Sequence, residues 1–98
     1  MTHSSRQVNE FGIIEYFNEK SQLHREDGPA RIWPDGSQIW YKNGERHREN
    51  GPAVIFPDGH QVWYKNGERH REDGPAVIYA GGNKQWWKNG EKIWPRND

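Results

Sequence analysis

HREDGPARIWPDGSQIWYKNGER, residues 24–46, is followed directly by HRENGPAVIFPDGHQVWYKNGER, residues 47–69, and the two stretches agree at 18 of 23 positions. A third stretch, HREDGPAVIYAGGNKQWWKNGEK at residues 70–92, carries the same landmarks at the same spacing. A fixed period of this length is the sequence signature of a repeat protein, in which each unit is one supersecondary motif. The three stretches therefore predict three tandem structural repeats.

The sequence on either side of these units is less regular. The segment 8–23 contains similar aromatic and apolar residues but no Asn-Gly, and its Phe17 lies one period before Trp40. We interpret it as a degenerate first unit. The expected organisation is a single repeat domain over 8–98, preceded by a flexible N-terminus at 1–7 and closed by a C-terminal cap at 93–98.

Two turn signals in the repeated units indicate β-hairpins. Asn-Gly, as at Asn66-Gly67, is the preferred pair for a two-residue type I′ turn, because both central residues need a positive φ. Pro-Asp-Gly, as at 57–59, favours a type I turn with glycine in the left-handed position. Aromatic and β-branched residues lie between these turns. The sequence thus predicts an all-β fold, with tandem β-hairpin repeats that form an open, single-layer antiparallel meander.

A two-residue loop at Asn66-Gly67 also determines which side chains face one another. The predicted pairs are Lys65 with Glu68, Tyr64 with Arg69, and Trp63 with His70. Because successive strand residues point to opposite sides, the aromatic residues of the units form two stripes. One stripe comprises Trp40, Trp63 and Trp86, and the other comprises Tyr41, Tyr64 and Trp87. We expect one stripe to be core and the other to be exposed, covered by a second copy, or a binding face.

The composition excludes several kinds of partner. Lys and Arg number 14, as do Asp and Glu, so the formal net charge is zero. A surface that binds duplex nucleic acid or an anionic membrane has a basic excess. The sequence has no cysteine, which excludes disulfides and thiolate metal sites. It shows neither a membrane-spanning apolar run nor a signal-peptide pattern. We therefore expect a cytoplasmic protein with no duplex nucleic acid or membrane as partner.

The repeats resemble MORN-type repeats (membrane occupation and recognition nexus), which also run at 23 residues. The resemblance rests on the aromatic-x-Asn-Gly motif at 41–44, on His47 and Gly51, and on Asp58-Gly59. HRENGPA is longer than the His-Gly-x-Gly corner of that family. The chain is therefore more similar to the variant MORN-like repeats of antitoxin-type bacterial proteins, and most similar to those of phage and large-virus proteins. The resemblance implies a scaffold that hosts different sites and, if the protein is viral, action in the host cytoplasm.

Histidine recurs with the units, at His24, His47 and His70, and His60 lies beside them. Equivalent side chains two strands apart are separated by about 10 Å, whereas a zinc ion needs its ligands within about 2.1 Å. We therefore expect no metal and no cofactor. A repeat also offers several copies of one environment, and a catalytic site needs one asymmetric constellation. The chain is expected not to be an enzyme.

The Arg-Glu pairs of the HRE motif allow two interpretations. They are either a row of groups that recognise carboxylate or phosphate, or a ladder of ion pairs that holds adjacent repeats in register. Exposed aromatic residues beside arginine are typical anchors of protein interfaces. The candidate partner-binding residues are Tyr41, Tyr64, Trp87, Arg46, Arg48, Arg69 and Arg71.

A second contact surface is predicted at the N-terminal end of the sheet. An open sheet leaves an edge strand with unpaired backbone groups, and the apolar segment 11–17 has neither Pro nor Lys to protect it. We expect a second copy or another partner to cover it. The residues predicted at this dimer or edge contact are Phe11, Ile13, Ile14, Tyr16 and Phe17.

These features predict a non-enzymatic protein-binding repeat module. The resemblance favours a small phage or viral factor that inhibits a host defence protein. Three alternatives stay open: an antitoxin-like or immunity-like binder, a nucleotide or small-ligand sponge with repeated Trp–Arg clefts, and a structural repeat protein that self-assembles. The expected partners are a protein and, in a homodimer, a second copy of the chain.

Overall fold

The computed structural model describes residues 5–95, and every regular element in this range is a β-strand. Nine strands form one antiparallel sheet in the order β1-β2-β3-β4-β7-β8-β11-β12-β13, and two further pairs are β5-β6 and β9-β10. The strands are β1 Ser5–Val8, β2 Ile14–Phe17, β3 Arg31–Ile32, β4 Gln38–Ile39, β5 Tyr41–Lys42, β6 Glu45–Arg46, β7 Val54–Ile55, β8 Gln61–Val62, β9 Tyr64–Lys65, β10 Glu68–Arg69, β11 Val77–Ile78, β12 Lys84–Lys88 and β13 Glu91–Trp94.

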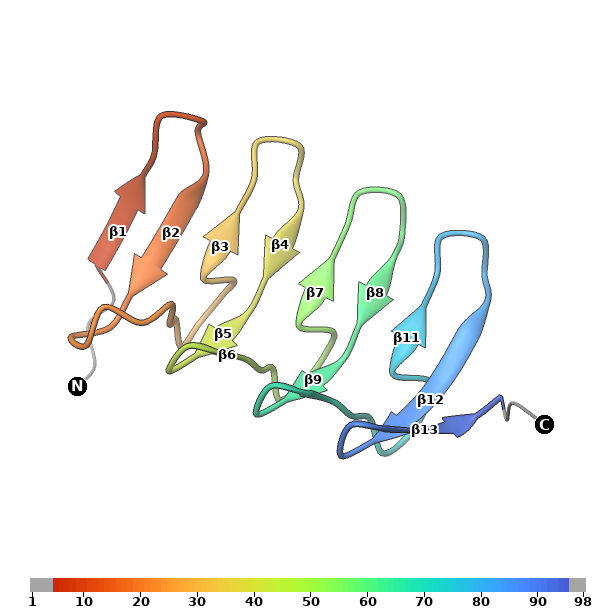
Figure 1. Ribbon diagram of the computed structural model, residues 1–98. Coiled ribbons are helices and arrows are strands. Elements are labelled where there is room, and N and C mark those ends of the chain that lie inside the picture. The colour runs from red at the N-terminus through yellow and green to blue at the C-terminus, as the bar shows by residue number, and fades with distance from the viewer. Residues whose placement is uncertain (1–4, 96–98) are drawn as a thin grey trace.

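Figure 1 shows the long hairpins side by side in a row, with the short hairpins along the lower edge of the row, at the ends of the long hairpins opposite their turns. The first strand of one long hairpin pairs with the last strand of the hairpin before it, as β7 does with β4 and β11 with β8. The sheet does not close on itself. The predicted open antiparallel meander of tandem hairpins is confirmed. The part of the chain that the structure describes provides no long apolar helix that could cross a membrane.

The Asn-Gly turns form the short hairpins as predicted. Asn66 and Gly67 have φ of 51° and 85°, and they join β9 to β10. The predicted pairs of Lys65 with Glu68 and Tyr64 with Arg69 are present. The N–H of His70 donates to the carbonyl oxygen of Trp63 at 3.1 Å, which places the third pair together as well.

Gly67→Ala is expected to lower the free energy of unfolding by about 1–2 kcal/mol, because a Cβ disfavours the left-handed conformation. The new Cβ would also lie 3.3 Å from Oε2 of Glu45. Chemical denaturation measures the difference. Gly67→Asn is the matched control, since asparagine adopts positive φ more readily than alanine, and it should lose less stability. An unchanged midpoint for Gly67→Ala would contradict the type I′ assignment.

The core lies on one face of the sheet, along a line of directly paired residues. Ile39, Val54, Val62 and Val77 face one another on four adjacent strands, and their exposed fractions are between 1% and 7%. A residue two positions after Ile39 or Val62 points to the same side. Accordingly, the stripe of Tyr41, Tyr64 and Trp87, together with Trp33, packs against this cluster. This stripe covers the core, which answers the question that the sequence left open.

The first unit is shifted by one residue from the position that the period predicts. The N–H of His24 donates to the carbonyl oxygen of Tyr16 at 2.9 Å, just as His47 donates to Trp40 at 3.1 Å. Tyr16, and not Phe17, therefore takes the place of Trp40. The prediction for Phe17 was wrong by one position.

An additional residue in the turn explains this shift. The Asn-Gly hairpin is replaced by a longer turn over 18–22, in which Ser21 has the positive φ of 62°. The side-chain oxygen of Asn18 accepts hydrogen bonds from the N–H groups of Lys20 and Gln22. The distance along the chain from Tyr16 to His24 is thus one residue longer than from Trp40 to His47.

Strand β1 lies beyond residues 11–17, which the sequence predicted to form the edge of the sheet. Strand β1 pairs with β2 along its whole length, so residues 5–7 of the segment 1–7 lie in the sheet, and residues 1–4 lie outside the described residues. The side-chain oxygen of Asn9 accepts hydrogen bonds from the N–H groups of Phe11 and Ile13. This turn folds β1 back onto β2. Strand β2 has a neighbour on both sides, and the sheet edge expected at 11–17 is one strand further out.

Candidate functional site

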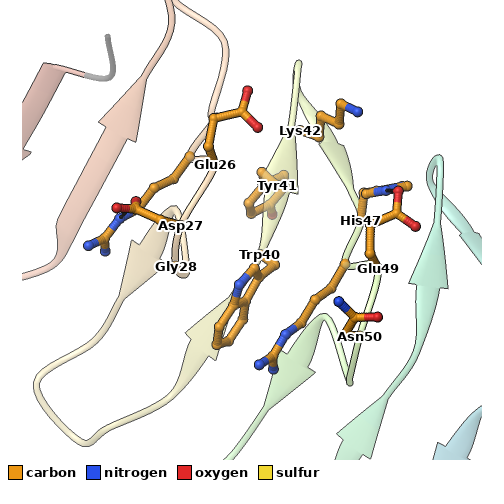
Figure 2. A pocket seen from close by; sticks show the side chains of 11 residues that line it. Glu26, Asp27, Gly28, Trp40, Tyr41, Lys42, His47, Glu49 and Asn50 are labelled. Carbon is orange, nitrogen blue, oxygen red and sulfur yellow. Dashed lines mark hydrogen bonds and ion pairs between the residues drawn. The ribbon is translucent and has the colours of Figure 1, made fainter. Parts of the chain in front are cut away.

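Each repeat begins with a loop that carries His-Arg-Glu, at 24–26, 47–49 and 70–72, and we call these the HRE loops. Two equivalent grooves lie between successive HRE loops. In the first, Trp40 and Tyr41 lie between the loop that carries Glu26 and Asp27 and the loop that carries Glu49 and Asn50 (Figure 2). Its volume is about 400 Å³. The second groove, of about 730 Å³, is lined by the residues one period further on. The loop of Arg48, Glu49 and Asn50 lines both grooves and separates them.

A stacked arginine forms part of each groove wall. Cζ of Arg48 lies 3.8 Å from the centre of the Trp40 ring, and Cζ of Arg71 lies 4.0 Å from that of Trp63. Arg25 covers Tyr16 in the same way at 4.1 Å. Nη1 of each arginine donates to the carbonyl oxygen of the proline four residues later, at 3.1 Å for Arg48 and Pro52. Ring and backbone together fix the orientation of each guanidinium.

The repeated histidines hold the Asn-Gly turns in place. Nδ1 of His47 accepts the N–H of Asn66 at 3.0 Å, and its Nε2 lies 3.0 Å from Oε1 of Glu49. The same two contacts recur at His24 and His70. A ring nitrogen that accepts from a backbone N–H carries no proton, so we assign a neutral ring whose Nε2–H donates to the glutamate.

The histidines are therefore engaged within the fold. Both ring nitrogens of each repeated histidine make hydrogen bonds, and within residues 5–95 no cluster of three or more His, Cys, Asp or Glu is arranged to hold a metal ion. His60 lies apart from them, edge-on to the rings of Phe56 and Tyr79 with centroids 5.5 Å and 5.0 Å away.

Within residues 5–95, the arginines of the HRE motif stack on aromatic rings and two of them pair with aspartates, which does not support the ladder of Arg–Glu ion pairs that was one of the two interpretations. Each glutamate accepts from the histidine of its own loop. Nε of Arg25 pairs with Asp27 at 3.3 Å, and Nε of Arg71 pairs with Asp73 at 3.2 Å. These ion pairs stabilise single loops, and the arginines connect repeats through ring stacking. The other interpretation, a row of recognition groups, stays a prediction.

The seven predicted binding residues divide into two groups. Arg46 and Arg69 lie over the rings of Tyr64 and Trp87, at 5.4 Å and 4.9 Å, on the side that covers the core. Arg48 and Arg71 lie in the groove walls, over the other aromatic stripe. The structure brings two of the predicted rings to the grooves as well, namely Tyr41 and Tyr64.

The predicted partner-binding residues did not include Trp40, Trp63 or the acidic loop residues, which line the grooves; only the alternative of a ligand sponge expected repeated Trp–Arg clefts. The signal was present, because two of the units place a tryptophan eight positions before an arginine, at Trp40–Arg48 and Trp63–Arg71. The predicted edge residues do not line either groove, although Tyr16 lies under Arg25, which lines the first one. Phe11 is 72% exposed in the first turn, whereas Ile13, Ile14, Tyr16 and Phe17 are half-buried.

Acid is expected to weaken the loops through Glu49 and Glu72. The hydrogen bond from His47 is the main cause that lowers the pKa of Glu49, and the hydrogen bond from His70, followed by the charge of Lys88, lowers the pKa of Glu72. A carboxyl whose pKa is lower in the folded state than its ordinary 4.5 stabilises the fold above pH 4.5 and loses this effect as pH falls through the folded value.

Denaturation midpoints at pH 5, 4 and 3 test this expectation. The midpoint should fall with pH, and it should fall less steeply in the double variant Glu49→Gln/Glu72→Gln. Glu19→Gln, in the exposed turn of the first unit, is the control and should follow the wild type. Parallel curves for all three proteins would refute the role of these carboxylates.

Comparison of the chain with family models, curated proteins and solved structures finds no match. The resemblance to MORN-type repeats stays a prediction.

Proposed function

We propose that the chain is a non-enzymatic repeat module that binds another protein through the two grooves between its HRE loops. The observation that carries this proposal is the duplication of the groove. Each copy combines a tryptophan, a tyrosine, an exposed lysine and the polar loop residues, 23 positions apart. An extended segment of a partner could make the same set of contacts twice, as repeat proteins commonly do along one surface.

A nucleotide or small ligand fits the grooves less well. A base is bound by stacking on an aromatic face, but Arg48 and Arg71 already cover one face of Trp40 and Trp63. The first groove also carries three basic residues (Arg25, Lys42, Arg48) and three acidic ones (Glu26, Asp27, Glu49), so no positive excess favours phosphates. Both grooves instead combine tryptophan, tyrosine and arginine, the residue types that are enriched at protein interfaces.

The resemblance to phage and large-virus repeats leads us to propose a host protein as the partner, which the chain would bind and inhibit in the host cytoplasm. A second copy of the chain is the alternative partner. Sedimentation at micromolar concentration distinguishes the two cases, since a homodimer has twice the mass of the monomer.

Affinity capture from host lysate tests the groove as the binding surface. Lys42 and Lys65 are exposed and line the first and second groove, so Lys42→Glu/Lys65→Glu should release the captured protein without disturbing the core. Lys20→Glu/Lys84→Glu makes the same charge change at exposed residues outside the grooves and should retain it. Equal capture by both double variants would exclude the grooves as the binding surface.

A further inference from the structure

The middle HRE loop differs from its two neighbours at one chemically important position. Asp27 and Asp73 pair with Nε of Arg25 and Arg71, at 3.3 Å and 3.2 Å. The equivalent residue of the middle loop is Asn50. Within residues 5–95, the side chain of Arg48 makes its stack on Trp40 and one hydrogen bond, from Nη1 to Pro52, and no ion pair.

We propose that Arg48 is the receptor for a carboxylate side chain of the bound protein, an aspartate or glutamate held in the loop that separates the two grooves. This inference rests on the proposed function and specifies the chemistry that the grooves recognise. Asn50 is then the residue that keeps the site open.

The contacts of Arg48 fix the position of its guanidinium before any ligand binds. Its Cζ lies 3.8 Å from the ring centre of Trp40, and Gly51 lies close on the loop side, where a Cβ would be 3.0 Å from Cζ. Nη1 donates to the carbonyl oxygen of Pro52, and a guanidinium has further N–H groups with which it can bind a carboxylate in a bidentate manner. A side chain that is already ordered loses little conformational entropy on binding.

Each groove as a whole carries equal numbers of basic and acidic residues, so the preference for a carboxylate comes from Arg48 itself, whose charge has no ion pair within residues 5–95. Burial lowers the pKa of Arg48, as expected for a partly desolvated cation without a counter-ion. The neighbouring carboxylate, Glu49, accepts a hydrogen bond from His47 at 3.0 Å. Lys42 lines the groove on one side of the loop and Lys65 the groove on the other.

Two variants change whether the arginine of a loop has an aspartate partner, while the size of the substituted side chain stays almost the same. Asn50→Asp gives Arg48 the intramolecular partner that Arg25 and Arg71 have, and it should close the site. Asp73→Asn removes the partner of Arg71 and should open an equivalent site in the second groove. Each variant swaps an amide and a carboxylate at an exposed loop position, so thermal unfolding is expected to change little.

The probe is the peptide acetyl-Gly-Gly-Glu-Gly-Gly-amide, titrated while the side-chain Nε–H resonances of arginine are followed by NMR. We expect the Arg48 resonance to shift and saturate with this peptide, and not with the otherwise identical glutamine peptide. Asn50→Asp should weaken the response at least tenfold. Asp73→Asn should add a response of similar size at Arg71.

A response of Arg48 to both peptides alike, or an undiminished response in Asn50→Asp, would overturn the carboxylate receptor. Lysate capture separates this failure from failure of the proposed function. If the wild type captures a partner and Asn50→Asp captures it equally well, the receptor is wrong and the protein-binding function stands. If the peptide titration succeeds but no protein is captured, the function fails and the carboxylate site stands.

Discussion

Gly74→Ala is expected to lower the free energy of unfolding by about 1–2 kcal/mol, from the weakening of one cation–π contact and one charge-assisted hydrogen bond. Gly74 is not among the glycines with positive φ, so backbone strain is not the reason. A Cβ at this position would lie 2.9 Å from Cζ of Arg71. The flexible end of the arginine would have to shift, which weakens its contacts with the ring of Trp63, 4.0 Å away, and with the carbonyl oxygen of Pro75, 3.0 Å away.

Gly81→Ala is the matched control for this prediction. Gly81 lies in the same repeat and also lacks a positive φ, and no neighbouring atom lies within 4 Å of the place that a Cβ would take. Its replacement should change stability by less than about 0.5 kcal/mol. Chemical denaturation of both variants measures the difference.

A double-mutant cycle identifies the cause. In the background of Arg71→Ala there is no guanidinium to displace, so adding Gly74→Ala should have little further effect. The two substitutions should therefore be strongly non-additive, by more than about 1 kcal/mol, as expected for residues in direct contact. Additive effects would mean that Gly74 is required for a reason other than room for Arg71.

The parts of the fold that local chemistry determines could be predicted from the sequence. A two-residue Asn-Gly turn allows one register, and it therefore gives the facing pairs of Lys65 with Glu68 and Tyr64 with Arg69, both of which are present. The alternation of side chains then gives the two aromatic stripes. Which stripe covers the core depends on Ile39 and Val62, two positions earlier on the same face, and this comparison was available in the sequence.

The contacts of the HRE loops could not be predicted in the same way. Nδ1 of His47 meets the N–H of Asn66, 19 residues later, and Arg48 reaches back to Trp40. Both contacts depend on how the loop from Glu49 to Pro52 bends. The sequence of an irregular loop does not determine which residues face one another, as the register of a two-residue turn does. The one-residue shift at Tyr16 has a similar origin, since a period cannot reveal that one turn is a residue longer than the others.

His24→Ala is expected to lower the free energy of unfolding by about 3 kcal/mol, from the lost burial of the ring and the loss of an acceptor for a backbone N–H. His24 is 2% exposed. Its Nδ1 accepts the N–H of Asn43 at 2.9 Å, and its Nε2 lies 3.0 Å from Oε1 of Glu26. His60→Ala is the control, because that ring lies in a half-buried aromatic contact, and it should cost about 1 kcal/mol or less.

Two further variants decide whether His24 acts through its volume or through its hydrogen bonds. Leucine fills much of the space of the ring but can neither accept the N–H of Asn43 nor donate to Glu26. Glutamine has an oxygen that can accept and an amide N–H that can donate. We therefore expect His24→Gln to recover part of the stability and His24→Leu to recover less, since an unsatisfied backbone N–H costs about 1–3 kcal/mol where water is excluded. If His24→Leu were the more stable of the two in chemical denaturation, the histidine would serve mainly as packing, and the assignment of a neutral ring that holds the Asn-Gly turn would be wrong.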